Sequence, residues 1–231
     1  NIDSMVNNYT ASKRPRRTDE YSPGGKSGFR PDRALSVYVD MVKKSYPNTP
    51  VVIGGIEASL RRFAHYDYWS DIIMPSILVD TQADMLLYGM SETQIKTLAH
   101  GLAKGWPIHK IKDIPGTCYM SRSLPKGNKY TLISSFEEVS TEKIKFAEAF
   151  QIQSREQNPF IGSTLVQKHG DLYLVQLPPA KPLSQSEMDE LYRLPFTRTY
   201  HPRYKNAGGV PALQEVEFSV TDHRGCFGGC S

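Results

Sequence analysis

Residues 51–59 read Val-Val-Ile-Gly-Gly-Ile-Glu-Ala-Ser, an all-apolar tripeptide followed by two glycines and a segment that favours a helix. Residues 83–92, Ala-Asp-Met-Leu-Leu-Tyr-Gly-Met-Ser-Glu, repeat this order of apolar strand, glycine and helix start. All-apolar strands are typical of parallel sheets that are covered on both faces. The two stretches therefore predict parallel strands at 51–53 and 84–88, with helices packed on the sheet.

Gly54 and Gly55 stand where the first of these strands ends. Ligands of parallel α/β sheets bind at the carboxyl ends of the strands. The two glycines are therefore candidate pocket residues. The alternative is that they only form a tight turn, because glycine accepts backbone angles that a β-carbon forbids.

Helices are predicted on both sides of these strands. The first begins near Asp32, a residue suited to capping, and ends before Pro47. The second covers about 57–63, and the third runs from Ser91, in a capping box with Gln94, to about Lys104.

The second half of the chain has a different pattern. Residues 111–133 contain only short apolar pieces between turns, and a helix is predicted over about 141–157. Apolar runs on both sides of His169-Gly170-Asp171 predict a hairpin over 165–175, which we expect to lie outside the parallel core. A proline-rich connector follows, and then a short helix that Ser184 and Glu187 cap.

His65, Asp67 and Cys118 are residue types that can take part in a site. His65 and Asp67 can hold a metal ion or polarise a substrate, but no third ligand stands near them, and we favour polar groups satisfied at a packed surface. Cys118 stands apart from the other cysteines, and we expect it to be a small packed side chain.

Near the C-terminus, Val216, Phe218 and Val220 alternate with polar residues, the pattern of a half-buried strand. A glycine-rich loop follows, with Cys226 and Cys230 four positions apart. Thiolates that converge in such a loop suit an iron–sulfur cluster. The alternative from the residues alone is a zinc or disulfide module at these two cysteines.

The loop Arg-Gly-Cys-Phe-Gly-Gly-Cys-Ser at 224–231 resembles the start of the Cys-x-x-x-Cys-x-x-Cys motif of radical S-adenosylmethionine (radical SAM) enzymes. Nearly the whole chain is similar to the YgiQ-type (UPF0313) proteins of that superfamily, most sharply at 1–14, 54–69, 194–202 and 224–231. The third cysteine of the motif would follow Ser231. We therefore expect the chain to be the front part of a longer enzyme.

This resemblance implies a 4Fe-4S cluster that binds S-adenosylmethionine and cleaves it to a deoxyadenosyl radical, with an unknown substrate. It implies that Cys226 and Cys230 are metal ligands and that Phe227 shields the cluster. With two of three ligands, the isolated chain is expected to hold no cluster and to be inactive.

Segments 51–59 and 83–92 also resemble the cobalamin-binding-type domain that precedes many radical enzyme barrels. The cobalamin-ligating motif of that domain, Asp-x-His-x-x-Gly, is missing from this sequence, so cobalamin binding is unsupported. The expected fold class is α/β, with a partial doubly wound, Rossmann-type parallel sheet. A small α+β extension would lead from it into the first strand of a radical SAM barrel.

The expected domains are an exposed basic loop at 1–31, the Rossmann-like domain at 32–140, the helix, hairpin and connector at 141–214, and the start of the barrel at 215–231. The basic loop carries Lys13, Arg14, Arg16 and Arg17. A nucleic-acid-binding module that uses this arm is an alternative function, but a solvated charge run is favoured because no aromatic residues interleave the charges.

The amino-acid composition limits the class of protein further. The net charge of +4 is modest, and 39% hydrophobic residues are ample for a core. The chain has no run of about 18 apolar residues, so no membrane-spanning helix is expected. Three cysteines do not make a disulfide framework, and the expected location is cytoplasmic.

Overall fold

The structure is a computed structural model that describes residues 3–126, 129–220 and 224. These residues divide into two compact units. The sheet unit comprises Leu35–Pro182, and the terminal unit comprises Asp3–Ala34 with the described residues from Leu183 onward. The sequence-based boundaries at 31, 140 and 214 stay a prediction for the domains of the longer protein.

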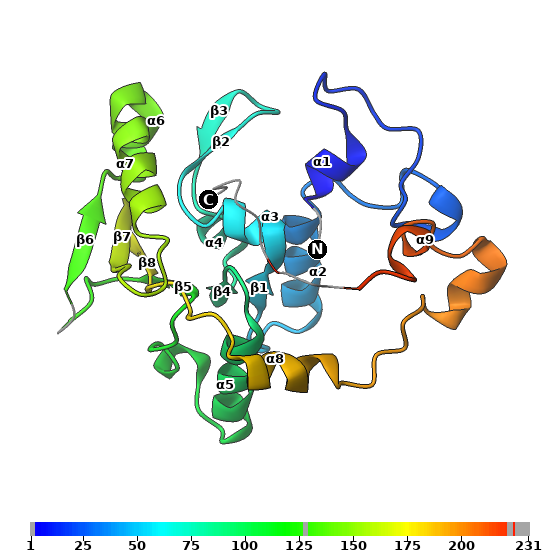
Figure 1. Ribbon diagram of the computed structural model, residues 1–231. Helices are drawn as coiled ribbons and strands as arrows, with labels where there is room; N and C mark the ends of the chain where they lie inside the picture. The colour runs from blue at the N-terminus through cyan, green and yellow to red at the C-terminus, as the bar shows by residue number, and fades with distance from the viewer. Residues whose placement is uncertain (1–2, 127–128, 221–223, 225–231) are drawn as a thin grey trace. The chain divides into compact units, whose positions relative to one another are not determined.

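The sheet unit is built on one six-stranded sheet in the order β1-β4-β5-β8-β7-β6 (Figure 1). Two of its pairs, β1 with β4 and β6 with β7, are parallel, and the other three are antiparallel. The sheet is therefore mixed. The strands are β1 Val52–Gly54, β4 Met85–Leu87, β5 Thr117–Ser121, β6 Tyr130–Ile133, β7 Thr164–His169 and β8 Leu172–Gln176. A separate small hairpin pairs β2 His65–Asp67 with β3 Ile72–Met74.

The predicted parallel pair is confirmed. Val52 lies opposite Met85 and Gly54 lies opposite Leu87, so β1 and β4 share one direction and one carboxyl edge. The all-apolar β4 is buried along its whole length. Such a strand is stable only where both faces of the sheet are covered, which explains why this prediction succeeded.

The hairpin over 165–175 forms, but the expectation that it lies outside the core is wrong. β7 and β8 pair antiparallel, and β8 then pairs with β5, with Cys118 opposite Gln176. Leu165 and Leu174 are fully buried in the common core. The partner strand β5 was not predicted because its five residues carry no clear period and lie between turns. The position of the hairpin in the sheet therefore could not be predicted either.

Helices cover one face of the sheet. On this face Leu86, Cys118, Leu165 and Leu174 form a continuous apolar core with helical side chains. The helices of the unit are α2 Ala34–Ser45, α3 Gly55–Leu60, α4 Ile77–Thr81, α5 Glu92–Ala103, α6 Phe136–Thr141 and α7 Lys143–Arg155, with the short 3-10 helix η2 Ile108–Lys110. Residues from α2, α3, α4, α6 and α7 belong to this core.

The opposite face is covered in two different ways. Behind β1 and β4, Leu98 of α5 packs with three isoleucines that follow it, at 108, 111 and 114. Behind β5, β8, β7 and β6, the cluster is made of strand and loop residues alone, with tyrosines around Val166 and Val175. The helical cover of this face therefore ends near β5.

The helices lie close to their predicted positions, but one of the predicted capping interactions does not form. Ser184 and Glu187 form the predicted capping box of α8 Gln185–Tyr192. At α5 the predicted box is wrong, because Ser91 makes no side-chain cap and Gln94 donates to the Met90 carbonyl instead. Gln94 is only 2% exposed, so its burial against Gly116 competes with a capping role.

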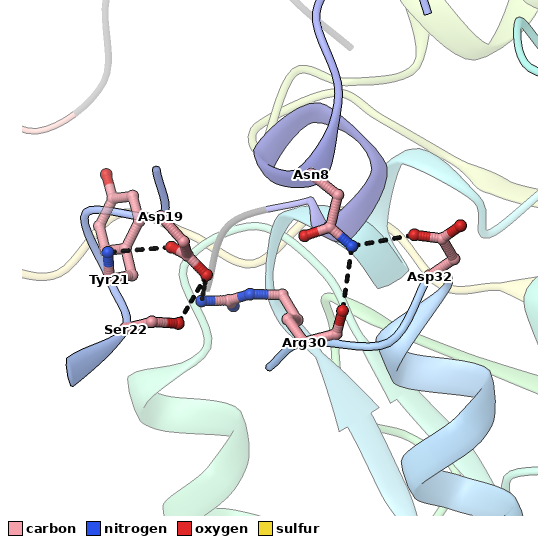
Figure 2. A network of polar contacts seen from close by, with 6 residues as sticks. All are labelled: Asn8, Asp19, Tyr21, Ser22, Arg30 and Asp32. Atoms are coloured by element: carbon pink, nitrogen blue, oxygen red, sulfur yellow. Dashed lines mark hydrogen bonds and ion pairs between the residues drawn. The ribbon is translucent and has the colours of Figure 1, made fainter. Parts of the chain in front are cut away.

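The terminal unit contains α1 Ser4–Asn8, η1 Pro23–Gly25, α8, η3 Pro202–Ala207 and α9 Leu213–Val216. The described residues of the segment 1–31, which is expected to be an exposed loop, are held by a polar network that also includes Asp32 (Figure 2). The Asn8 side-chain amide donates to Asp32 and to the Arg30 carbonyl, and Arg30 pairs with Asp19 at 3.5 Å. Asp19 is 4% exposed and accepts from the Ser22 hydroxyl. The buried Asp19 and the hydrogen bonds of Asn8 give the segment a defined conformation that its polar sequence did not predict.

The basic residues of this segment remain on its surface. Lys13, Arg14, Arg16 and Arg17 are all exposed. Arg16 is also structural, because its Nε donates to the carbonyls of Val6 and Tyr9. The nucleic-acid alternative for this arm stays a prediction.

The strand predicted around Val216, Phe218 and Val220 is wrong for this chain. Leu213–Val216 is the short helix α9, and a turn follows it. Phe218 is 93% exposed and Val220 is 90% exposed. A strand needs a neighbour for its backbone groups and its apolar face, and no strand among the described residues pairs with this segment.

Candidate functional site

The ends of four strands meet at one edge of the sheet. The parallel strands β1 and β4 end at Gly54 and Leu87, and the antiparallel β5 begins opposite Leu87 with Thr117. β8 ends there too, since Gln176 lies opposite Cys118. We call this the carboxyl edge. The loop that follows α3 reaches this edge and brings its own side chains to it.

The two predicted glycines stand at the carboxyl edge. A β-carbon on Gly54 would lie 3.2 Å from the Leu87 carbonyl oxygen, which is tighter than ordinary contact. Gly55 has a φ of +83°, which glycine accepts without strain. Both residues therefore allow β1 to pack against β4 and turn at once into α3. Whether they also line a ligand pocket stays a prediction.

Arg62, 6% exposed, is a charged group buried at this edge. Its Nε donates to Gln176 Oε1 at 2.6 Å, and one terminal nitrogen donates to the Ser59 carbonyl at 2.5 Å. The guanidinium carbon also lies 5.1 Å from the centre of the Tyr88 ring. Burying a cation is costly unless it is hydrogen-bonded, and these neutral groups meet that requirement.

Two ionisable side chains near Arg62 stay protonated. Burial raises the pKa of Tyr88, and its hydroxyl donates to the Leu177 carbonyl at 2.6 Å. Burial also raises the pKa of Cys118 to about 12, although the positive charge of Arg62 opposes this. Cys118 is fully buried, as the sequence predicted for a packed thiol. A protonated, enclosed thiol is neither a nucleophile nor a metal ligand.

A second polar network lies on the same face of the sheet. Gln167 Oε1 accepts from the Ala64 backbone N–H at 2.8 Å, and Gln167 Nε2 donates to the Ser134 carbonyl at 3.0 Å. His169 Nε2 lies 3.2 Å from the same Gln167 oxygen. Because that oxygen can only accept, His169 Nε2 carries the proton and Nδ1 is the bare acceptor. Burial lowers the pKa of His169 to about 4, so the ring is neutral near pH 7.

His65 and Asp67 take structural roles in the β2–β3 hairpin. His65 Nδ1 lies 3.1 Å from the Phe63 carbonyl, and Asp67 accepts from the Ser70 backbone N–H at 2.8 Å. Within the described residues, no group of three or more histidine, cysteine or acidic side chains could hold a metal ion. The hydrogen bonds of His65 Nδ1 and of Asp67 agree with the interpretation of these two residues as polar groups held at a packed surface.

Sequence patterns did not single out Arg62 and Gln176 at the carboxyl edge, or Gln167 in the second polar network. In the sequence, Arg62 lies at a helix end, Gln167 lies within the predicted hairpin, and Gln176 follows the last residue of that hairpin. One signal could have found the glutamines. They occupy inward positions in strands whose neighbouring inward residues are apolar, and a polar side chain at such a position needs buried partners.

The predicted cluster ligands Cys226 and Cys230, with Phe227 between them, lie outside the described residues. The described residues contain one cysteine, Cys118, whose raised pKa makes it unsuitable as a ligand. They therefore supply none of the thiolates that a 4Fe-4S cluster requires, and no chemical step through such a cluster follows from their geometry.

Comparison with known proteins identifies relatives across the whole chain. The radical SAM N-terminal family matches residues 1–219. The chain is 57% identical over 231 residues to a UPF0313 protein of Clostridium botulinum (strain 657 / Type Ba4). It is 51% identical over 231 residues to a UPF0313 protein of Methanocella arvoryzae and 50% identical over 232 residues to one of Clostridium perfringens (strain 13 / Type A).

All of this chain aligns with these relatives, but it spans only about a third of their length, at 36%, 38% and 35% respectively. No solved structure matches the chain. None of the helices in the described part of the chain has both the length and the apolar character that crossing a bilayer requires.

Proposed function

We propose that this chain, which belongs to the radical SAM N-terminal family, is the front part of an iron–sulfur enzyme that cleaves S-adenosylmethionine. One observation carries the proposal. The family match ends at residue 219, and the glycine-rich loop with Cys226 and Cys230 follows directly in the sequence. A domain that precedes radical SAM barrels and the first two cysteines of the radical SAM motif thus occur in the expected order.

In the longer protein, Cys226 and Cys230 would supply two thiolate ligands, and a third cysteine would come from the sequence that follows Ser231. Phe227 would shield the group from water. A bound 4Fe-4S cluster would supply the electron that cleaves S-adenosylmethionine.

The exposed apolar residues Val216, Phe218 and Val220 fit the same proposal. Their alternation suits a strand with one buried face, but they are exposed in this chain. We propose that they form the first strand of the barrel when its remaining strands are present. The helix α9 and the turn after it would then be replaced by that strand.

The sheet unit would present its carboxyl edge to small molecules. Ligands of parallel α/β sheets bind at the carboxyl ends of the strands, and Gly54 and Gly55 stand where β1 ends and α3 begins. The buried cation of Arg62 lies at the same edge. Cobalamin is not proposed as the ligand, because its motif is missing from the sequence.

The test uses the longer protein, extended through the third cysteine and the barrel, after anaerobic reconstitution with iron and sulfide. We expect it to convert S-adenosylmethionine to 5′-deoxyadenosine under reducing conditions. Cys226→Ala and Cys230→Ala should each abolish this product. Cys118→Ala is the matched control, because it removes a thiol that is fully buried in the core and leaves the motif intact.

The outcome that contradicts the proposal is equally specific. Retained cleavage in both motif variants would show that these cysteines are not cluster ligands. A tightly bound zinc ion in place of iron would favour the alternative zinc module. Equal losses in Cys118→Ala and in the motif variants would indicate general damage to the fold.

A further inference from the structure

A pocket of about 460 Å³ opens on the sheet unit. It lies beside β5, where the helical cover of the second face of the sheet ends. Its volume falls within the range of small-molecule sites. The lining residues are His109, Lys110, Lys112, Asp113, Tyr119, Pro125, Lys126, Thr164 and Leu177.

Part of the pocket lining is buried, and one wall, the segment that carries Lys112 and Asp113, is fixed by its buried neighbours. Thr164 and Leu177 are 5% and 7% exposed and form part of the lining. Lys112 follows the buried Ile111, and Ile114 is buried two residues later, so both ends of this short wall are anchored in the core. The Thr117 hydroxyl, which donates to the Ile114 carbonyl at 2.8 Å, fixes the wall further.

Lys112 is pre-positioned within this wall. Its ammonium nitrogen lies 4.9 Å from the centre of the Tyr119 ring, a cation–π contact that keeps it at the pocket. The side chain of Lys112 is half-buried. Burial and the negative charge of Asp113 raise the pKa of Tyr119, so the phenol adds no negative charge.

The lining is predominantly positive. It contains three lysines, at 110, 112 and 126, against the single carboxylate of Asp113. None of the ion pairs recorded among the described residues involves these lysines. Positive charges that converge on a concave surface with low-dielectric walls raise the local concentration of anions. Ammonium groups on flexible stems are common ligands of phosphate groups.

We propose that this pocket binds a phosphorylated small molecule, with Lys110 and Lys112 holding its phosphate groups. A compact anion fits better than a nucleic acid, because the lysines surround a pocket and do not form a stripe along an extended surface. The pocket lies wholly within the sheet unit. Its binding therefore does not depend on the iron–sulfur cluster or on the radical SAM reaction.

The experiment is calorimetric titration of the 231-residue chain with inorganic pyrophosphate, ATP and a single-stranded oligonucleotide at low salt. We expect pyrophosphate and ATP to bind at one site per chain. Lys112→Met keeps the apolar stem and removes the charge, and it should weaken binding about tenfold, the usual effect of losing one charge-assisted hydrogen bond. Combining it with Lys110→Met should weaken binding about a hundredfold.

Two further variants make the result decisive. Lys104→Met is the matched control, because Lys104 also stands over an aromatic ring, Trp106 at 5.4 Å, but does not line the pocket. It should leave the affinity unchanged. Asp113→Asn removes the opposing carboxylate and should strengthen binding by about twofold to threefold, a gain that misfolding cannot produce.

Three results would overturn the proposal. The first is the absence of pyrophosphate binding at low salt, where electrostatic attraction is strongest. The second is an equal loss of affinity in Lys104→Met and Lys112→Met, which would indicate non-specific attraction. The third is binding of the oligonucleotide alone, which would assign the lysines to a nucleic-acid surface.

Discussion

The strand β4 and the segment 216–220 both carry apolar residues in strand-like patterns, yet they adopt different structures. Met85, Leu86 and Leu87 are buried between neighbouring strands and covered on both faces. Phe218 and Val220 extend into solvent after a short helix. The difference teaches that an apolar pattern specifies a strand only when the same chain supplies the strands beside it.

The largest expected change in the free energy of unfolding distinguishes β4 from the segment 216–220. Leu86 is a fully buried residue of β4, the strand that lies between β1 and β5. Leu86→Ala should therefore lower the free energy of unfolding by about 3 to 4 kcal/mol. Phe218→Ala removes a larger side chain but should change it by less than about 0.5 kcal/mol, because that ring is exposed. Urea denaturation followed by circular dichroism measures both. A comparable loss in the two variants would contradict the contrast.

The next effect is a pH dependence confined to the sheet unit. The folded state lowers the pKa of His169 from 6.5 to about 4, so the unfolded chain binds more protons between these values. The contribution of the neutral ring is complete above pH 6.5 and is lost as the pH falls through this window, by about 3 kcal/mol in total.

Denaturation midpoints measured between pH 7 and pH 4 test this dependence on His169. The stability of His169→Gln should fall less between pH 7 and pH 4 than that of the original chain, because the variant lacks the histidine that becomes protonated on unfolding. An unchanged slope in the variant would assign the acid sensitivity to other groups.

A smaller effect tests whether the terminal unit is as well ordered as the sheet unit. Gly24 has a φ of +63°, and a β-carbon there would lie 2.5 Å from the Ala207 carbonyl oxygen. Gly24→Ala should therefore destabilise this unit by about 2 kcal/mol and expose it to proteases. Gly28→Ala is the matched control, because its φ of +88° is also positive but no atom lies within 4 Å of the added carbon. Equal proteolysis rates in the two variants would show that the Gly24–Ala207 contact is not maintained.

The smallest effect compares two helix caps of one type. Ser135 and Ser184 form the same capping box with a glutamate three residues later. α6 buries Val139 in the core, whereas α8 buries no side chain. Ser135→Ala should lower global stability by about 1 kcal/mol, and Ser184→Ala should reduce only local protection of α8 in hydrogen exchange. A larger global loss in Ser184→Ala would reverse this order.

The sequence predicted local elements better than their assembly. The parallel strands were visible because Val52 to Gly54 and Met85 to Leu87 are followed by glycine or a helix start. The hairpin at 165–175 was visible from its turn, but its place in the sheet depended on β5, whose five residues carry no clear period. Long-range pairing of this kind is not encoded in any one segment.

The candidate site was predicted less well than the fold. Gly54 and Gly55 were singled out because their backbone role follows from residue type alone. Arg62 donates a hydrogen bond to Gln176, which lies 114 positions later in the sequence. No local sequence pattern could have predicted that these two residues are partners. The lysines at 110, 112 and 126 were likewise unremarkable until the fold placed them around one pocket.

The proposal that Cys226 and Cys230 hold a cluster is tested most directly by counting metal atoms. Iron and zinc should be measured after anaerobic reconstitution in this chain, in the longer protein, and in the longer protein with both cysteines replaced by alanine. We expect about four iron atoms in the longer protein and almost none in the other two. Four iron atoms in the doubly substituted protein, or zinc in place of iron in the longer protein, would contradict it.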